Sequence, residues 1–178
     1  MAKNFFTRFR WFWAWQDERE EAWLGKMSAQ GYHLSSMGFP GFYTFSKGEP
    51  KEYVYRLDYQ TFRKKDKQEY LQLFSDAGWE YMGDMGAWQY FRKEVRPGET
   101  NEIFTDNESK IGKYKRIIYF SVFFYLIFCV LFIGRITGEI PYRWWDAIQI
   151  FYVVVFLLLT YALIRLTLRI RKLRKSKD

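Results

Sequence analysis

Two long stretches without a charged residue constrain the fold of this chain more than any other feature. The first covers 117–134, and the second covers 147–164 with Gln149 as its one strongly polar residue. At about 1.5 Å per residue, a helix of either length spans roughly 27 Å, close to the thickness of a bilayer's hydrocarbon core. A buried hairpin in a soluble core is the alternative, but a chain of 178 residues has no layer to cover it. The sequence therefore predicts a two-helix transmembrane hairpin with a short external loop at 135–146.

Basic residues flank these stretches unevenly. The segment 110–116 carries four of them, the segment 165–178 carries seven, and the loop between the stretches is neutral. Basic residues accumulate in the short loops that stay on the cytoplasmic side of a membrane. We therefore expect a multi-pass protein of the cell membrane, with both termini in the cytoplasm.

The charge of the remaining chain argues against binding to nucleic acid. The pI is about 9.5 and the net charge is +8, but residues 1–109 hold 15 basic and 17 acidic residues, a net −2. A DNA- or RNA-binding domain would carry its basic excess on the folded module. The excess flanks the apolar stretches instead, so the composition indicates a lipid bilayer as partner.

The basic tail at 165–178 allows two interpretations. Leu163, Leu166, Ile170 and Leu173 recur at helical spacing, so the tail extends the second helix. The basic side chains would hold anionic lipid at about 1 kcal/mol each, or would serve only as a topology signal with snorkelling side chains, which we favour. The candidate lipid-contacting residues are Arg165, Arg169, Arg171, Lys172, Arg174 and Lys175.

A helix start precedes the first apolar stretch. Thr105 and Glu108 have the T-x-x-E spacing of a capping box, which satisfies free N–H groups in the first turn. The segment 105–116 is therefore expected to begin a helix that continues through the membrane. A cation site at this acidic cluster is the weaker alternative, because spacing and location both fit the cap.

The region before this helix contains an internal repeat. WLGKMSAQGY begins at Trp23 and YLQLFSDAGW begins at Tyr70, and FYTFSK and WQYFRK follow them at similar distances. An aromatic run precedes each unit, so each unit reads strand, helix, strand, strand. Gly31 and Gly78 stand where a helix needs a left-handed residue after its end. Asp17 with Glu20, and Asp66 with Glu69, have the spacing of a capping box for the two helices.

The predicted fold class follows from this duplication. Residues 1–104 should form a cytoplasmic α+β domain with six strands and two helices. We expect an antiparallel sheet with both helices on one face, followed by the transmembrane hairpin. The order of the strands does not follow from the sequence.

The aromatic content of this domain suggests a binding surface. If both helices cover one face of the sheet, aromatic residues line the other face, with charged residues beside them. The simpler interpretation, which we favour, is that aromatic residues suit strands and fill a small core. The candidate residues for a ligand or partner are Tyr53, Tyr55, Arg56, Asp58, Trp88, Tyr90 and Arg92.

No catalytic residues, metal ligands or cofactor motif are predicted. His33 is the one histidine, and the one cysteine, Cys129, lies in an apolar stretch, so a zinc site would lack its usual ligands. His33 is expected in a strand near the surface. Gly83 and Gly86 fit a hairpin turn better than a phosphate loop, because no Lys-Ser/Thr pair follows them.

The chain resembles a bacterial membrane-protein family known as domain of unknown function 2812. The resembling segments are EEAWLGKMSAQGYHL, YTFSKGEPKEYVYRLDY, GWEYMGDMGAWQYFRKE and IFTDNESK. The resemblance implies a protein of the bacterial cytoplasmic membrane, with an N-terminal cytoplasmic domain and C-terminal membrane helices. Such proteins are often encoded beside regulators of the PadR type. The family supplies no catalytic residues.

Three functions fit these expectations. The leading hypothesis is a non-enzymatic, membrane-tethered module that binds a cytoplasmic ligand or partner protein. The first alternative is an accessory subunit of a membrane transporter, held through the transmembrane hairpin. The second is a membrane-bound enzyme that uses Asp58, Arg56 and nearby tyrosines.

Overall fold

A computed structural model describes residues 5–62, 64–104, 107–136 and 145–175. The chain divides into two compact units, Met1–Asp106 and Asn107–Asp178, two residues beyond the boundary expected from the sequence. Residues 137–144 of the predicted loop, and Thr105 of the predicted capping box, lie outside the described ranges.

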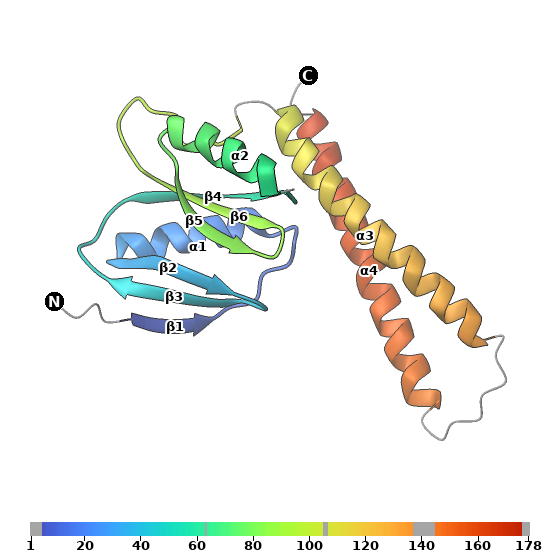
Figure 1. Ribbon diagram of the computed structural model, residues 1–178. Coiled ribbons are helices and arrows are strands. Elements are labelled where there is room, and N and C mark those ends of the chain that lie inside the picture. The colour runs from blue at the N-terminus through green and yellow to red at the C-terminus, as the bar shows by residue number, and fades with distance from the viewer. Residues whose placement is uncertain (1–4, 63, 105–106, 137–144, 176–178) are drawn as a thin grey trace. The chain divides into compact units, whose positions relative to one another are not determined.

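The first unit is an α+β domain with two three-stranded antiparallel sheets (Figure 1). Its strands alternate aromatic or branched residues with polar ones, the pattern that suits a half-buried sheet. The first sheet has the order β1-β3-β2 and the second has the order β4-β6-β5. The elements are β1 (Phe5–Phe9), α1 (Asp17–Ala29), β2 (Tyr32–Gly38), β3 (Phe42–Lys47), β4 (Tyr53–Tyr59), α2 (Lys64–Asp76), β5 (Glu80–Met85) and β6 (Trp88–Glu94).

The two halves of the domain repeat the same β-α-β-β arrangement. Both helices have 13 residues, and the third strand of each half pairs with the other two. Each second strand carries one register irregularity, between Leu34 and Ser36 in β2 and between Tyr81 and Gly83 in β5. These positions coincide when Gly31 is aligned with Gly78. The repeat found in the sequence therefore extends to strand register.

The prediction of one sheet with both helices on one face was wrong. Strands β2 and β5 lie side by side, and Met37 Sδ would be 3.3 Å from a Cβ on Gly83, but they share no ladder. Both irregularities occur on these two strands, and such bulges bend a strand and increase its twist. The sheets therefore part along β2 and β5 and enclose α1.

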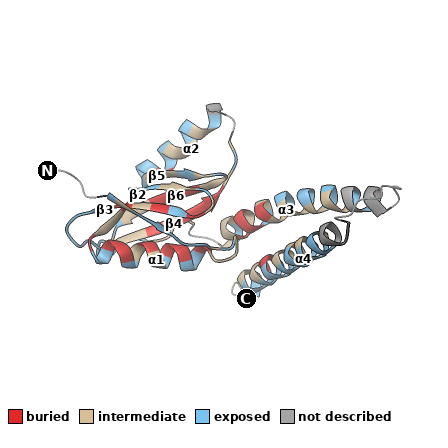
Figure 2. Cartoon of the chain, turned by 90° about the horizontal axis from the view of Figure 1, so that it is seen from below, coloured by how far each residue is buried: buried red, intermediate tan, exposed pale blue. Residues whose placement is uncertain are grey.

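Helix α1 packs against both sheets and forms the main core. Leu24 and Met27 contact Leu34 and Phe45 of the first sheet and Leu57 of the second, all at most 3% exposed. Figure 2 shows the buried residues along α1. Burial of each large apolar side chain contributes about 1.5–3 kcal/mol. Helix α1 thus supplies apolar core residues to both sheets.

Helix α2 covers the opposite face of the second sheet. Phe74 of α2 stacks on Phe91 of β6 with ring centroids 4.4 Å apart, and Trp79 completes this smaller core. Because side chains alternate along a strand, Tyr90 of β6 lies in the α1 core while Phe91 lies under α2. The second sheet is therefore covered on both faces.

The second unit consists of two helices packed side by side, α3 (Asn107–Ile136) and α4 (Trp145–Lys175). Asn107 Nδ2 donates to the Leu173 carbonyl at 3.2 Å, so the start of α3 lies beside the end of α4. Leu166 and Ile170, from the apolar stripe of the tail, are buried. Among the described residues, one helical stretch, Ile150–Lys175, is long and apolar enough to cross a membrane, with a mean hydropathy of 2.2. The second predicted span remains a prediction.

Gly31 and Gly78 end their helices as the sequence predicted, with φ of +82° and +81°. We predict that Gly31→Ala destabilises the domain more than Gly78→Ala. Both substitutions force alanine into a left-handed conformation, at about 1–2 kcal/mol. A Cβ at Gly31 would also lie 2.5 Å from the Gly48 carbonyl oxygen, whereas at Gly78 it would meet only the flexible Lys93 side chain at 3.5 Å. Urea unfolding of the detergent-solubilised chain measures the stability of both variants. Equal losses of stability would contradict the close contact between Gly31 and the Gly48 carbonyl.

Candidate functional site

The seven candidate residues predicted from the sequence lie on both faces of the second sheet. Tyr55 and Tyr90 belong to the core beneath α1, with Tyr53 and Trp88 packed against it. Arg56 and Asp58 alternate with these tyrosines along β4 and lie on the other face. The structure therefore groups the aromatic residues on one face, as predicted, but separates Arg56 and Asp58 from them.

The aromatic face is covered by α1 instead of being open. Tyr55 is 1% exposed and Tyr90 is 0% exposed, and the Tyr55 hydroxyl shares a hydrogen bond of 2.8 Å with Ser28 Oγ of α1. The guanidinium of Arg92 lies 4.8 Å from the ring centroid of Tyr53 and forms two hydrogen bonds with Glu80 at 2.7 and 2.8 Å. These aromatic residues are thus part of the core, which is the interpretation favoured from the sequence, and they do not form an open binding face.

A buried carboxylate joins α1 to both sheets. Glu20 is 6% exposed, and its Oε1 accepts hydrogen bonds from the hydroxyls of Tyr43 on β3 and Tyr90 on β6. Burial raises the pKa of Glu20 above its ordinary value, against the hydrogen bonds from Tyr90 and Tyr43 that lower it, and Asp17 raises it further. Burial and the Glu20 charge raise the pKa of both tyrosines, so they remain donors. The sequence suggested a helix cap for Glu20, but its carboxylate points into the core.

The charged residues of β4 also make internal contacts. Glu21 Oε1 accepts the backbone N–H of Leu57 at 2.8 Å, and Arg56 pairs with Glu102 at 2.8 Å. Asp58 is 2% exposed and accepts the Tyr70 hydroxyl at 2.9 Å. These contacts tie α1, β4, α2 and the segment after β6 together, which is a structural role.

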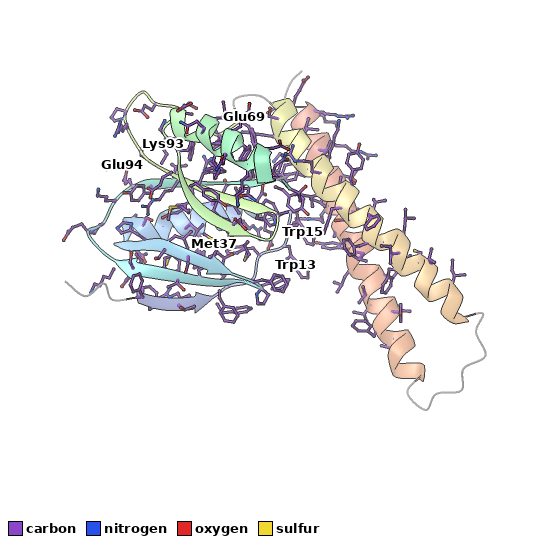
Figure 3. The ribbon with its side chains drawn as sticks, viewed as in Figure 1. Trp13, Trp15, Met37, Glu69, Lys93 and Glu94 are labelled. Atoms are coloured by element: carbon purple, nitrogen blue, oxygen red, sulfur yellow. The ribbon has the colours of Figure 1, made fainter. Side chains whose placement is uncertain are left out.

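An open groove runs along α2, with a volume of about 610 Å³. The rings of Phe62 and Tyr70 lie 4.4 Å apart in its lining. Gln60 Oε1 is buried without a hydrogen-bond partner, and Gln72 donates to Asp76 at 2.7 Å. Figure 3 shows Glu69 on α2. The groove is lined by Gln60, Thr61, Phe62, Asp66, Glu69, Tyr70, Gln72, Leu73 and Asp76.

The groove brings acceptors and aromatic rings together. Three of its lining residues, Asp66, Glu69 and Asp76, are carboxylates, and no arginine or lysine is among the described lining residues. Sequence reasoning missed this site because Asp66 and Glu69 fit a capping box. Three carboxylates on a helix beside a strand-to-helix connection were the available signal.

The chain is similar in sequence to a known protein family. A family model described as a protein of unknown function, DUF2812, matches residues 16–129, which is more than half of the chain. The chain belongs to the DUF2812 family. No curated protein and no solved structure matches it. The family resemblance predicted from the sequence is confirmed, and the matched range covers the elements from α1 to β6 and most of α3.

In the described part of the chain, six large aromatic residues are exposed at the first sheet and the connections next to it. Phe9 of β1 and Phe42 of β3 are register partners with ring centroids 5.2 Å apart. Trp11 and Trp13 follow β1, and Figure 3 shows Trp13 and Trp15 in the connection to α1. The six, with exposed fractions of 40–83%, are Phe5, Phe9, Trp11, Trp13, Phe39 and Phe42. None was predicted as a site, because the aromatic run was interpreted only as a strand.

The predicted lipid-contacting residues lie along the last turns of α4. Arg169 Nε donates to the Tyr114 hydroxyl at 3.4 Å, and the Arg165 guanidinium lies 5.9 Å from the Tyr161 ring centroid. The other four, Arg171, Lys172, Arg174 and Lys175, are exposed. Within the described part of the chain, no group of three or more His, Cys, Asp or Glu side chains is arranged to hold a metal ion.

We predict that Glu20→Gln flattens part of the pH dependence of stability. The pKa of Glu20 in the folded state lies above its ordinary value near 4.5. The folded state therefore binds the proton of the Glu20 carboxyl more tightly than the unfolded state does. The resulting stabilisation is present below pH 4.5 and is lost as the pH rises through the folded pKa. Glutamine keeps an acceptor for both tyrosines without a charge. The free energy of urea unfolding, measured from pH 4 to 8, should therefore fall with pH in the wild type relative to this variant.

The matched control is Glu20→Leu. It leaves the Tyr43 and Tyr90 hydroxyls buried without their acceptor, so it should cost about 2 kcal/mol or more at every pH. Superimposable pH profiles for the wild type and Glu20→Gln would show that Glu20 titrates normally and would contradict the buried network.

Proposed function

We propose that this protein is a membrane-anchored, non-enzymatic binding module. In this proposal α3 and α4 both span the cytoplasmic membrane, and both termini lie in the cytoplasm. The α+β domain then binds a donor-rich, cationic ligand in the groove along α2. The observation that carries the proposal is the groove itself, which combines carboxylates, aromatic rings and an unpartnered buried acceptor.

The chemistry of the groove favours an ammonium or guanidinium group. When ionised, Asp66, Glu69 and Asp76 can only accept hydrogen bonds. Gln72 supplies one donor to Asp76, and further donors would come from a ligand or from water. A cation over the rings of Phe62 and Tyr70 would gain about 0.5–1 kcal/mol at such an exposed site. A donor that reaches Gln60 Oε1 would satisfy a buried acceptor that lacks a hydrogen-bond partner among the described residues.

The basic residues at 63–65 favour the opposite prediction, a ligand with negative charge. They precede the groove carboxylates in the sequence, and they would attract an anionic ligand. Lys67, the next basic residue, is already paired with Asp84 at 2.8 Å. Comparing the binding of a polyamine with the binding of a polyvalent anion therefore distinguishes a cationic ligand from an anionic one.

We predict that spermidine binds the full-length chain in detergent and that Glu69→Gln weakens this binding. An exposed carboxylate contributes up to about 1 kcal/mol to such a contact, so the loss is up to about fivefold, and roughly tenfold or more with Asp76→Asn added. Isothermal titration calorimetry measures the affinity for spermidine of the wild type and of both variants. Glu94→Gln is the matched control, because Glu94 is an exposed acid of the same domain outside the groove. Binding of citrate instead of spermidine, or equal losses in the control, would end the proposal.

The anchoring rests on the apolar stretch of α4 and its basic end. We predict that the chain stays in the membrane pellet after alkaline carbonate extraction. Leu157→Arg with Leu158→Arg should release it, because each arginine at a helix centre opposes insertion by about 2.5–3.5 kcal/mol. Substituting the exposed Arg174 and Lys175 by glutamine leaves the apolar stretch intact and is the control. A C-terminal reporter that is active only outside the cell would contradict the orientation.

A second candidate function is an accessory subunit of a membrane transporter. An apolar hollow of about 280 Å³ lies between α3 and α4, lined by Phe128, Cys129, Ile133, Tyr152, Val153 and Phe156. It would accept a side chain from a helix of a larger membrane protein. Under this alternative, a polytopic protein co-purifies with the chain, and exchange of α3 and α4 for unrelated apolar helices abolishes the association.

A further inference from the structure

Two arginine side chains at the edge of the first sheet point toward α1. Arg8 of β1 donates from Nη1 to Met27 Sδ of α1 at 3.8 Å. Arg10 follows β1 directly, and its guanidinium lies 5.0 Å from the ring centroid of Trp23 on α1 and 5.2 Å from that of Phe12. Both arginines are exposed, so solvent reaches them on the side away from these contacts.

Helix α1 adds two more cations to the same surface. Arg19 stands four residues before Trp23 and Lys26 stands three residues after it, spacings that place side chains on one face of a helix. Arg19 and Lys26 are both exposed. Because Arg10 lies over the ring of Trp23, this helix face and the β1 arginines form one continuous surface. We call Arg8, Arg10, Arg19 and Lys26 the basic flank.

The basic flank is not neutralised by the described part of the domain. Among the residues that the structure describes, no carboxylate forms an ion pair with any of its four cations. The second sheet and α2 differ in this respect, because their cations are paired with carboxylates at 2.7–2.8 Å. These paired cations are Arg56, Lys67, Arg92 and Lys93.

The acidic residues of α1 lie away from the basic flank. Asp17, Glu20 and Glu21 are buried, at most 8% exposed. Glu18 is exposed, but it shares its helix face with Gly25, which packs against the β4 backbone. Residues 5–16 and 30–48, which form the first sheet and its connections, contain no aspartate or glutamate. The basic flank is therefore a positive surface on a domain whose net charge is negative.

We propose that the basic flank binds a ligand with closely spaced phosphate groups. An arginine donates two parallel hydrogen bonds to phosphate oxygens through its planar guanidinium. Arg10 is already held against two aromatic rings, so it loses less side-chain freedom when it binds an anion. A soluble polyphosphate and a lipid headgroup with two phosphates both present this chemistry. The site is separate from the groove on α2 and takes a ligand of the opposite charge.

Titration calorimetry of inorganic tripolyphosphate into the full-length chain in neutral detergent tests this site. Arg10→Gln should weaken binding up to about fivefold, and Arg10→Gln with Arg19→Gln about tenfold or more, because these contacts are exposed. Arg10→Lys should restore only part of the affinity, because lysine keeps the charge but lacks the planar guanidinium. Arg19→Gln alone, on the exposed side of α1, keeps the test independent of any loss of folding caused by Arg10→Gln.

The matched control is Lys51→Gln with Arg96→Gln. It removes two exposed cations from the same domain outside the basic flank. Equal losses of tripolyphosphate affinity in this control, or full recovery by Arg10→Lys, would show a general charge effect and overturn the site. An unchanged affinity in the flank variants would place the phosphate on other basic residues and would also overturn it.

A second titration, with a short-chain cardiolipin in the same detergent, identifies the source of the phosphate. Cardiolipin binding that the flank variants weaken, without tripolyphosphate binding, would support the site with a lipid headgroup as its ligand. Tripolyphosphate binding alone would support it with a soluble ligand, and binding of neither would overturn it. Glu69→Gln should leave tripolyphosphate affinity unchanged, and the flank variants should leave spermidine affinity unchanged, so the two proposed sites fail independently.

Discussion

The packing of α1 between two sheets is the constraint on which the domain depends. Its apolar residues, Leu24 and Met27, contact both sheets, and its carboxylates reach both as well. Glu20 accepts hydroxyls from β3 and β6, and Glu21 accepts a backbone N–H of β4. Buried carboxylates are costly unless they are hydrogen-bonded. These hydrogen bonds stabilise the buried carboxylates, and they also fix the position of each sheet against α1.

The two repeats share one architecture but different surroundings. α1 has a sheet on each side, whereas α2 has a sheet on one side only. Gly25 allows this close contact, because a Cβ there would lie 3.2 Å from the Tyr53 carbonyl oxygen. Gln72 occupies the equivalent position of α2 and lines the groove. The groove on α2 and the exposed aromatic residues of the first sheet are thus the two outer surfaces of this repeated stack, as far as the structure describes it.

The candidate residues show where sequence reasoning succeeded and failed. The alternation along β4 correctly grouped Tyr53 and Tyr55 on one face, because side-chain direction in a strand depends on sequence position alone. Whether that face was open depended on α1, which belongs to the other repeat and reaches the second sheet across the domain. The same pattern in β1 leaves Phe5 and Phe9 exposed, because none of the described elements packs on that face. Exposure therefore could not be assigned from the pattern of either strand.

The sequence by itself determined the family, the α+β class, the repeated order of strand and helix, the left-handed glycines after both helices, and an apolar helix near the C-terminus. Each of these depends on local properties: periodicity, backbone freedom at glycine, and uninterrupted hydropathy. Only the tertiary structure decided that six strands form two sheets, that α1 lies between them, and that Glu20 points inward. Those features depend on contacts between residues up to 70 positions apart, such as Glu20 with Tyr90. No local pattern encodes which distant surface a side chain will meet.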